Sequence, residues 1–187
     1  MLVAALVLSP RPASAQLNSD VGLSAGVMKR FTTGAASGVS QPGFGPVVDL
    51  RAHVALLPMI RIGLYVAYDH SPMPGAGDRN FVTGGLHLKF TPPLLPAPWK
   101  TYLFTGFGAG YAEADAYPSM GSLTGTLLEI PLGLGLARKL GTSWELFTEL
   151  GGRFGVATFG PMYEARPGFT GADSFALALT VGVSLSN

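Results

Sequence analysis

Three histidines are evenly spaced along the chain, at positions 53, 70 and 87. Imidazole is a common metal ligand and general base, so this spacing raises the question of a metal or catalytic site. A metal site needs ligands that converge within a few ångströms. If each histidine lies on its own strand, His53 and His87 point inward but are separated by a strand, and His70 falls near a rim. We therefore predict no metal site, and we interpret the equal spacing as a strand repeat.

The stretch "YDHSP" holds a carboxylate, an imidazole and a hydroxyl side by side, at Asp69, His70 and Ser71. Some small barrel enzymes use such groups to trim or transfer the acyl chains of lipid A. A working triad needs the base within hydrogen-bond reach of the nucleophile, with the acid orienting the base. Consecutive strand residues point to opposite faces, so these three cannot cooperate unless a loop folds them together. We predict no catalytic residues.

Two glycine-rich stretches, "MPGAGD" and "GFGAG", resemble phosphate loops only superficially. Neither has the GxxxxGK[ST] pattern nor opens a helix, so loop and lumen glycines are the better interpretation. The chain has no cysteine, which excludes disulfides and thiolate metal sites. No cofactor is predicted.

The composition indicates a chain that meets little water. Apolar residues make up 48% of the 187 residues and charged residues 12%, about half the usual charged share. Mean hydropathy is +0.36. A helical membrane protein would show apolar runs of about 18 residues or more, and glycine, proline, threonine or a charge interrupts every stretch here. The net charge of +1 and the lack of a basic cluster argue against a nucleic-acid partner.

The N-terminal stretch "MLVAALVLSPRPASAQ" has the features of an export signal. A short apolar core from Leu2 to Leu8 precedes Ala13-Ser14-Ala15, a small-x-small cleavage pattern. The positive segment that normally comes first is missing. We therefore expect residues 1–15 to be a signal peptide truncated at its start, and residues 16–187 to form one outer-membrane domain.

Eight segments of the chain alternate large apolar residues with small or polar ones. Each is close to the 9–11 residues that an outer-membrane strand needs. In the clearest segment Val48 and Leu50 alternate with Asp49 and Arg51, whereas in the fifth Tyr102 and Phe104 fall on the glycine side and leave its phase less certain. The segments are residues 20–32, 47–57, 59–69, 80–91, 100–112, 128–140, 143–157 and 173–186. They predict an all-β, eight-stranded antiparallel up-and-down transmembrane β-barrel.

Volume decides which face of the barrel is wet. An eight-stranded barrel has an interior just wide enough for side chains or one small ligand, so the bulky apolar set must face outward into lipid. The small and charged set then fills the lumen. Buried charges need partners, and four acids face four bases in this phase, which predicts an internal salt-bridge network and no open pore. The network residues are Asp49, Arg51, Arg61, Lys89, Glu129, Glu145, Glu149 and Arg153.

The connections support the same topology. Short joins follow strands two, four and six, and mostly longer joins near 33–46, 70–79, 113–121 and 158–172 follow the others, which predicts short periplasmic turns and longer extracellular loops. Pro131 lacks an N–H within strand six, so we predict a bulge or one absent ladder bond there. Aromatic residues near strand ends, which suit interfacial girdles, are Phe31, Phe44, Phe81, Phe90, Trp99, Trp144, Phe159, Phe169 and Phe175.

Three stretches of the chain carry a family resemblance. "YLFTGFGAGYAEAD" resembles the aromatic and alternate-glycine pattern of strand five in the OmpA-like family of small outer-membrane β-barrels, and "EIPLGLGLARKL" followed by "SWELFTELGGRFG" resembles its next hairpin. The resemblance implies insertion by the outer-membrane assembly machinery, whose recognition signal lies in the final strand. Residues 180–187 match that signal in part, with Asn187 in place of the usual terminal aromatic residue.

These observations predict a non-enzymatic barrel of the Gram-negative cell outer membrane. It would have an envelope structural role or contact partners through its loops, with membrane lipid and lipopolysaccharide around it. A lipid A-modifying enzyme or a conduit for small apolar solutes stays open as the alternative. Within loop 158–172 we select Tyr163, Glu164 and Arg166 as candidate contact residues. The oligomeric state is not predicted.

Overall fold

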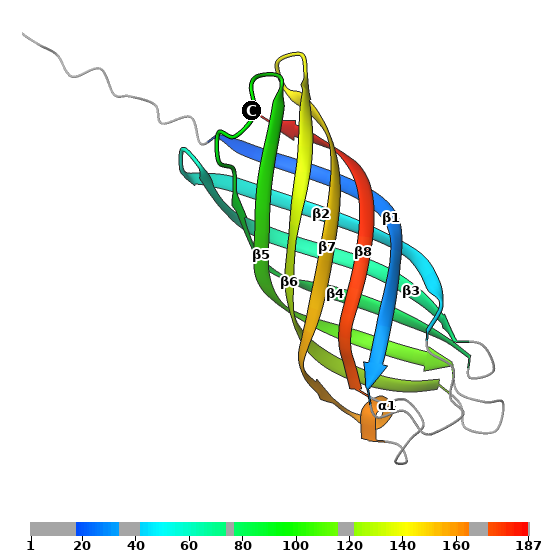
Figure 1. Cartoon of the computed structure of the whole chain (residues 1–187). Helices are drawn as coiled ribbons and strands as arrows, with labels where there is room; N and C mark the ends of the chain where they lie inside the picture. The colour runs from blue at the N-terminus through cyan, green and yellow to red at the C-terminus, as the bar shows by residue number, and fades with distance from the viewer. Residues whose placement is uncertain (1–17, 34–41, 74–76, 116–121, 165–171, 187) are drawn as a thin grey trace, which may run out of the picture.

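Eight antiparallel strands close into a barrel in the order of the sequence (Figure 1). The computed structural model describes residues 18–33, 42–73, 77–115, 122–164 and 172–186, so the expected signal peptide, residues 1–15, lies outside the described residues. The strands are β1 (Ser19–Thr33), β2 (Phe44–Leu57), β3 (Ile60–Met73), β4 (Gly77–Phe90), β5 (Trp99–Asp115), β6 (Ser122–Leu140), β7 (Trp144–Phe159) and β8 (Ala172–Ser186). The fold class expected from the sequence is confirmed.

The alternation read from the sequence sets the two faces of every strand. In β2 the side chains of Val48 and Leu50 are exposed while Asp49 and Arg51 between them are buried. The uncertain phase of β5 is now clear, because Tyr102 is only 2% exposed and Leu103 is 52% exposed. Tyrosine and phenylalanine therefore occupy lumen positions of β5, where small residues on the neighbouring strands leave room for their rings.

The strands are longer than the sequence pattern indicated, mainly at one end of the barrel. The expected range 100–112 becomes Trp99–Asp115, and 128–140 becomes Ser122–Leu140. β3 and β4 likewise continue through Pro72, which pairs with Asp78, so most of the join expected at 70–79 is hairpin. These extensions are rich in glycine and polar residues, so no apolar alternation marks them in the sequence.

The two ends of the barrel differ in their connections. The joins 58–59, 91–98 and 141–143 lie at the end where β1 starts and β8 finishes, which we call the turn end (Figure 1). The opposite end, the loop end, carries α1 (Pro161–Glu164). In outer-membrane barrels the turn end faces the periplasm. Among the described residues no helix is long and apolar enough to cross a membrane.

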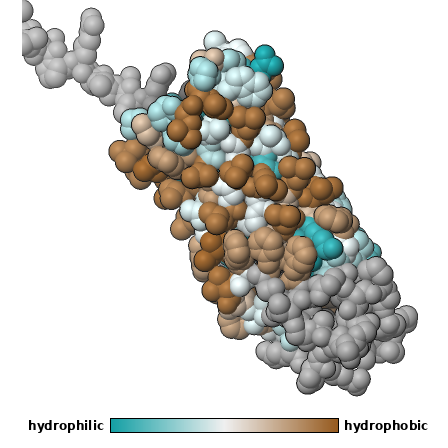
Figure 2. Space-filling model, viewed as in Figure 1, coloured by the Kyte–Doolittle hydropathy of each residue, from teal (hydrophilic) through white to brown (hydrophobic). Residues whose placement is uncertain are grey.

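Large apolar side chains are exposed along the outer surface of the barrel, and on the face shown in Figure 2 they form a broad apolar belt. Leu64 is 62% exposed and Val181 56%, and all eight strands contribute such side chains. Only lipid tolerates this over a whole circumference. Among the expected girdle residues Phe81 is an exception, because it is fully buried in the lumen with Ala112, Leu127 and Met162. Its inward position follows from the same phase as Thr83, and Phe169 lies outside the described residues.

Pro131 interrupts the ladder between β5 and β6, as its missing N–H predicts. Thr105 pairs with Leu132 and Gly108 pairs with Glu129, and no ladder pair lies between these two. A register shift on the other side of β6 falls close by, between Leu128 and Glu129. The sixth strand therefore carries a local defect on both sides, at the height of the central lumen charges.

Candidate functional site

The lumen contains all eight charged side chains that the sequence assigned to it. Six are buried, and Arg61 and Lys89 are partly buried. Apolar clusters lie with them, one toward the loop end around Phe81 and another toward the turn end that joins Tyr102, Phe104 and Phe147. The interior is therefore a packed core with charges through its middle.

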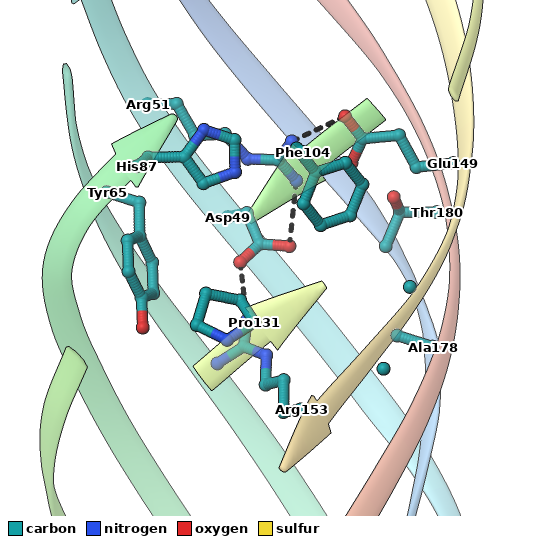
Figure 3. Close-up of a pocket in the computed structure, with 12 residues that line it drawn as sticks. Asp49, Arg51, Tyr65, His87, Phe104, Pro131, Glu149, Arg153, Ala178 and Thr180 are labelled. Atoms are coloured by element: carbon teal, nitrogen blue, oxygen red, sulfur yellow. Dashed lines mark hydrogen bonds and ion pairs between the residues drawn. The ribbon is translucent and has the colours of Figure 1, made fainter. Parts of the chain in front are cut away.

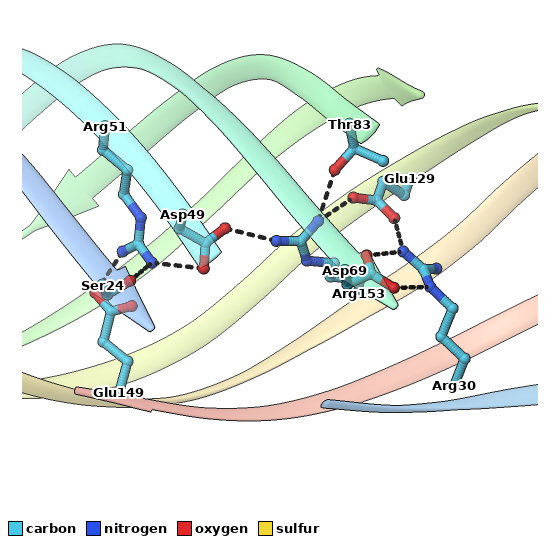
Figure 4. Close-up of polar contacts among 9 residues, drawn as sticks. All are labelled: Ser24, Arg30, Asp49, Arg51, Asp69, Thr83, Glu129, Glu149 and Arg153. Atoms are coloured by element: carbon cyan, nitrogen blue, oxygen red, sulfur yellow. Dashed lines mark hydrogen bonds and ion pairs between the residues drawn. The ribbon is translucent and has the colours of Figure 1, made fainter. Parts of the chain in front are cut away.

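Five of these charges form a continuous chain of alternating sign, which we call the ionic ladder (Figure 4). Arg51 donates to Glu149 at 2.5 Å and to Asp49 at 3.4 Å. Arg153 donates to the other oxygen of Asp49 at 2.7 Å and to Glu129 at 2.9 Å. Each arginine thus bridges two carboxylates from different strands, and this cross-links the barrel wall through its interior.

The ladder continues toward the loop end through two residues that the charge count omitted. Arg30 holds Asp69 in a bidentate pair, with both N···O distances at 2.8 Å, and lies 3.7 Å from Glu129. The guanidinium also stacks over Phe81 at 3.9 Å. The sequence signal for Arg30 was available, because it shares the inward phase of Gly22, Ser24 and Gly26 on β1.

Toward the turn end the remaining charges pair with partners that the sequence did not suggest. Arg61 binds Asp20 at the start of β1, and Lys100 binds Glu145. Lys89 lies over the ring of Tyr102 at 4.2 Å. The hydroxyl of Tyr102 donates to Glu149 at 2.6 Å, which connects this region to the ionic ladder.

The two inward histidines meet, although a strand separates them. His53 Nε2 and His87 Nδ1 are 2.8 Å apart, and His53 Nδ1 lies 2.7 Å from Asp20. Gly63 occupies the register position between them on β3 and makes this contact possible. A Cβ at Gly63 would lie 1.9 Å from the carbonyl oxygen of Ala52 and 2.7 Å from the His53 ring. Our expectation that the intervening strand keeps them apart is wrong.

The groups of "YDHSP" do not form a triad. Asp69 is committed to Arg30, and Ser71 Oγ is buried without a hydrogen-bond partner in the described part of the chain. His70 instead meets Asn80, with a distance of 3.0 Å between Nδ1 and Oδ1. Within the described ranges, no three histidine or carboxylate side chains are placed to share a metal ion.

Little free volume remains around the ladder. The central cavity holds about 30 Å³ and is bounded by Asp49, Arg51, Tyr65, His87 and Arg153 among others (Figure 3). About 10–15 Å³ of such volume admits one water molecule, so the cavity has room for two or three. The arrangement is suited to holding the barrel together, and a solute has no space at this height.

Of the three candidate loop contacts, the structure places only the side chain of Tyr163. It is half-buried and packs against the cluster of Phe81, Leu127 and Met162, with its ring over Gly125. The side chain of Glu164 and all of Arg166 lie outside the described residues. Tyr163 therefore covers the loop end of the lumen, and its use as a contact residue stays a prediction.

Solved structures share this fold. Neisserial surface protein A matches with 15% identity and a TM-score of 0.63, over 89% of this chain and 96% of that one. A major outer membrane protein from Thermus thermophilus matches with 14% identity and a TM-score of 0.65, over 92% and 100%. Ail, the attachment invasion locus protein of Yersinia pestis, matches with 11% identity and a TM-score of 0.52, over 91% and 99%.

No protein-family model and no curated protein matches the sequence. The structural matches show a common fold, and the apolar exterior gives the class: the chain is an eight-stranded transmembrane β-barrel with the fold of these small outer-membrane proteins.

Proposed function

We propose that the protein is a non-enzymatic outer-membrane barrel with a sealed lumen, which contributes to the envelope and presents its loops for contacts. The ionic ladder carries this proposal. Arg30, Arg51 and Arg153 connect carboxylates on different strands, and the space left between them holds only a few water molecules. Such an interior supports a rigid scaffold and opposes a solute path.

The test is conductance in planar lipid bilayers. The wild-type protein should give no steady current, because the ladder and the aromatic side chains block its axis. The double variant Arg51→Ala/Arg153→Ala should conduct if it inserts, because it removes both bridging guanidiniums. The matched control Lys29→Ala/Arg138→Ala removes two cations from outside the lumen and should stay silent. A wild-type protein with steady conductance would refute the sealed lumen.

The enzymatic alternative has a separate test. The lumen carboxylates are paired with arginine or lysine side chains, and Ser71 has no base within hydrogen-bond reach among the described residues. We therefore expect lipid A mass spectra to be the same with and without the protein expressed. Expression of the wild-type protein could instead add or remove an acyl chain on lipid A. If the Ser71→Ala and His70→Ala variants caused the same change, the activity would lie at another site. Loss of that change in either variant would establish "YDHSP" as the active site.

The proposed lipid partner of the loop end is lipopolysaccharide. Lys29 lies on the outward face of β1, with its ammonium 5.4 Å from the ring centre of Phe31 and 5.2 Å from that of Phe44. A cation within an aromatic girdle at this end suits the phosphate groups of an outer-leaflet lipid. Co-purifying lipopolysaccharide should fall in a Lys29→Met variant and stay unchanged in Arg138→Met, at the opposite end.

Biogenesis through the outer-membrane assembly machinery is proposed on β8. Its outward residues Leu179, Val181 and Val183 alternate with the inward Thr180, Gly182 and Ser184. Polar substitution of the outward residues should slow assembly by purified machinery in vesicles, whereas conservative substitution of Ser184 by alanine should not. Equal rates for both would remove β8 as the recognition element.

A further inference from the structure

A second cavity lies at the turn end of the lumen, separate from the central one. The volume of this cavity is about 130 Å³. One water molecule needs only about 10–15 Å³, so the cavity has room for a small ligand. Its polar lining comes from four strands and one connection, and we call it the vestibule. The lining includes Arg61, Lys89, Thr91, Lys100, Tyr102 and Glu145.

The vestibule has more positive than negative charge. Arg61 is paired with Asp20, and Lys100 is paired with Glu145. The carboxylates of these two ion pairs are therefore taken by Arg61 and Lys100, and Lys89 is left without a paired carboxylate.

Lys89 has no carboxylate within ion-pair distance anywhere in the described ranges of the chain. Its closest electrostatic contact is the face of Tyr102 at 4.2 Å. The carboxylates of Asp20, Glu145 and Glu149 act on it from beyond ion-pair distance, and each is already paired with another cation. The hydroxyl of that tyrosine is already committed to Glu149, so it does not accept from the ammonium. Lys89 also stands directly opposite Arg61 in the β3–β4 ladder, and like charges in that position repel.

A partly buried ammonium beside a second cation is costly unless an anion compensates it. We propose that the vestibule binds a small oxyanion carrying a phosphate group, with Lys89 as its principal charged ligand. Arg61 and Lys100 add positive charge from either side, and the hydroxyl of Thr91 lines the same space. Phosphate suits this site because lysine binds it as a point charge without a fixed fork geometry.

This inference does not depend on the sealed lumen. The vestibule opens toward the turn end, and it would bind its anion whether or not the ladder blocks passage beyond it. The phosphate group could belong to a soluble ion or to the headgroup of a phospholipid, and the experiment distinguishes these sources.

The test is calorimetric titration of inorganic phosphate into the full chain, refolded in detergent micelles at low ionic strength. The wild-type protein should bind one phosphate saturably. Lys89→Met, which keeps the length and apolar stem of the side chain, should weaken this binding tenfold or more. Arg138→Met removes a cation from the exposed outer face of β6 and should bind like the wild type. Heat-modifiable gel migration establishes that each variant is folded.

Competition identifies the source of the phosphate group. Displacement by glycerol phosphate but not by short-chain phosphatidylglycerol supports a soluble ligand, and displacement by both supports the same site with a lipid headgroup. No saturable binding by the wild type would overturn the proposal. Equal binding by folded Lys89→Met and wild type would overturn it as well, because the vestibule would then not hold the anion through Lys89.

Discussion

Replacing Arg153 by methionine tests the ionic ladder at its centre. The guanidinium donates to Asp49 at 2.7 Å, to Glu129 at 2.9 Å and to Thr83 at 2.6 Å. Methionine keeps much of the side-chain volume but leaves two buried carboxylates with one cation fewer. Breaking a buried ion pair in this way costs roughly 3–5 kcal/mol.

The structure places the expected loss near the lower end of that range. Asp49 keeps Arg51 at 3.4 Å, and Glu129 keeps Arg30 at 3.7 Å, so neither carboxylate is left alone. We expect the free energy of unfolding to fall by about 3 kcal/mol, a factor of more than 100 in the unfolding equilibrium. The control Arg138→Met removes an exposed guanidinium that stacks on Trp99 at 5.5 Å, and should cost less than about 1 kcal/mol.

The assay is equilibrium unfolding by urea in lipid vesicles, followed by the fluorescence of Trp99 and Trp144. Both tryptophans lie on the outer face, so their emission reports loss of the lipid environment. The double variant Arg153→Met/Glu129→Leu should recover part of the loss, because it also removes one of the two buried carboxylates that lose their contact with Arg153. Equal stability of Arg153→Met and the wild type would refute the reasoning that the ladder holds the barrel together.

Two further predictions concern the backbone of the lumen wall. Gly63→Ala places a Cβ 1.9 Å from the carbonyl of Ala52 and should separate His53 from His87, destabilising the barrel by about 1–3 kcal/mol in the same unfolding assay. Gly22→Ala, whose nearest atoms would be 3.4 Å away, is the matched control and should change stability little; equal effects of the two would contradict the close approach at Gly63. Pro131→Ala restores a backbone N–H where the β5–β6 ladder is interrupted, and should stabilise the barrel by no more than about 1 kcal/mol. A loss of several kcal/mol in that variant would show that the ring of Pro131 is needed for packing in the lumen.

The sequence predicted the strands and their faces because the period of two is a local property. Each residue of β2 could be assigned to lipid or lumen from its immediate neighbours, and the same rule would have placed Phe81 inside. The height of a side chain along the barrel axis is not local in this way. Arg30 meets Asp69 because strand tilt and stagger bring β1 and β3 to the same level across the interior.

The histidine pair shows the same limit. Alternation places His53 and His87 in the lumen, but their contact depends on the glycine at the intervening position of β3. The extended ends of β5 and β6 were missed for another reason. Beyond the apolar belt the outward residues no longer need to be apolar. The alternation that marks a strand in the sequence therefore disappears, although the backbone pairing between β5 and β6 continues.

The central claim is that the apolar face of each strand points into lipid and the polar face into the lumen. Site-directed spin labelling of β8 tests this claim most directly. The chain has no natural cysteine, so a single cysteine substitution creates one unique labelling site. The positions to substitute one at a time are Leu177, Leu179, Val181, Val183 and Leu185. In lipid bilayers, collision with oxygen should be greatest near Val181, and collision with a water-soluble nickel reagent should rise toward Leu185. A nickel reagent that reaches Val181 as readily as Leu185 would contradict a lipid-facing apolar belt.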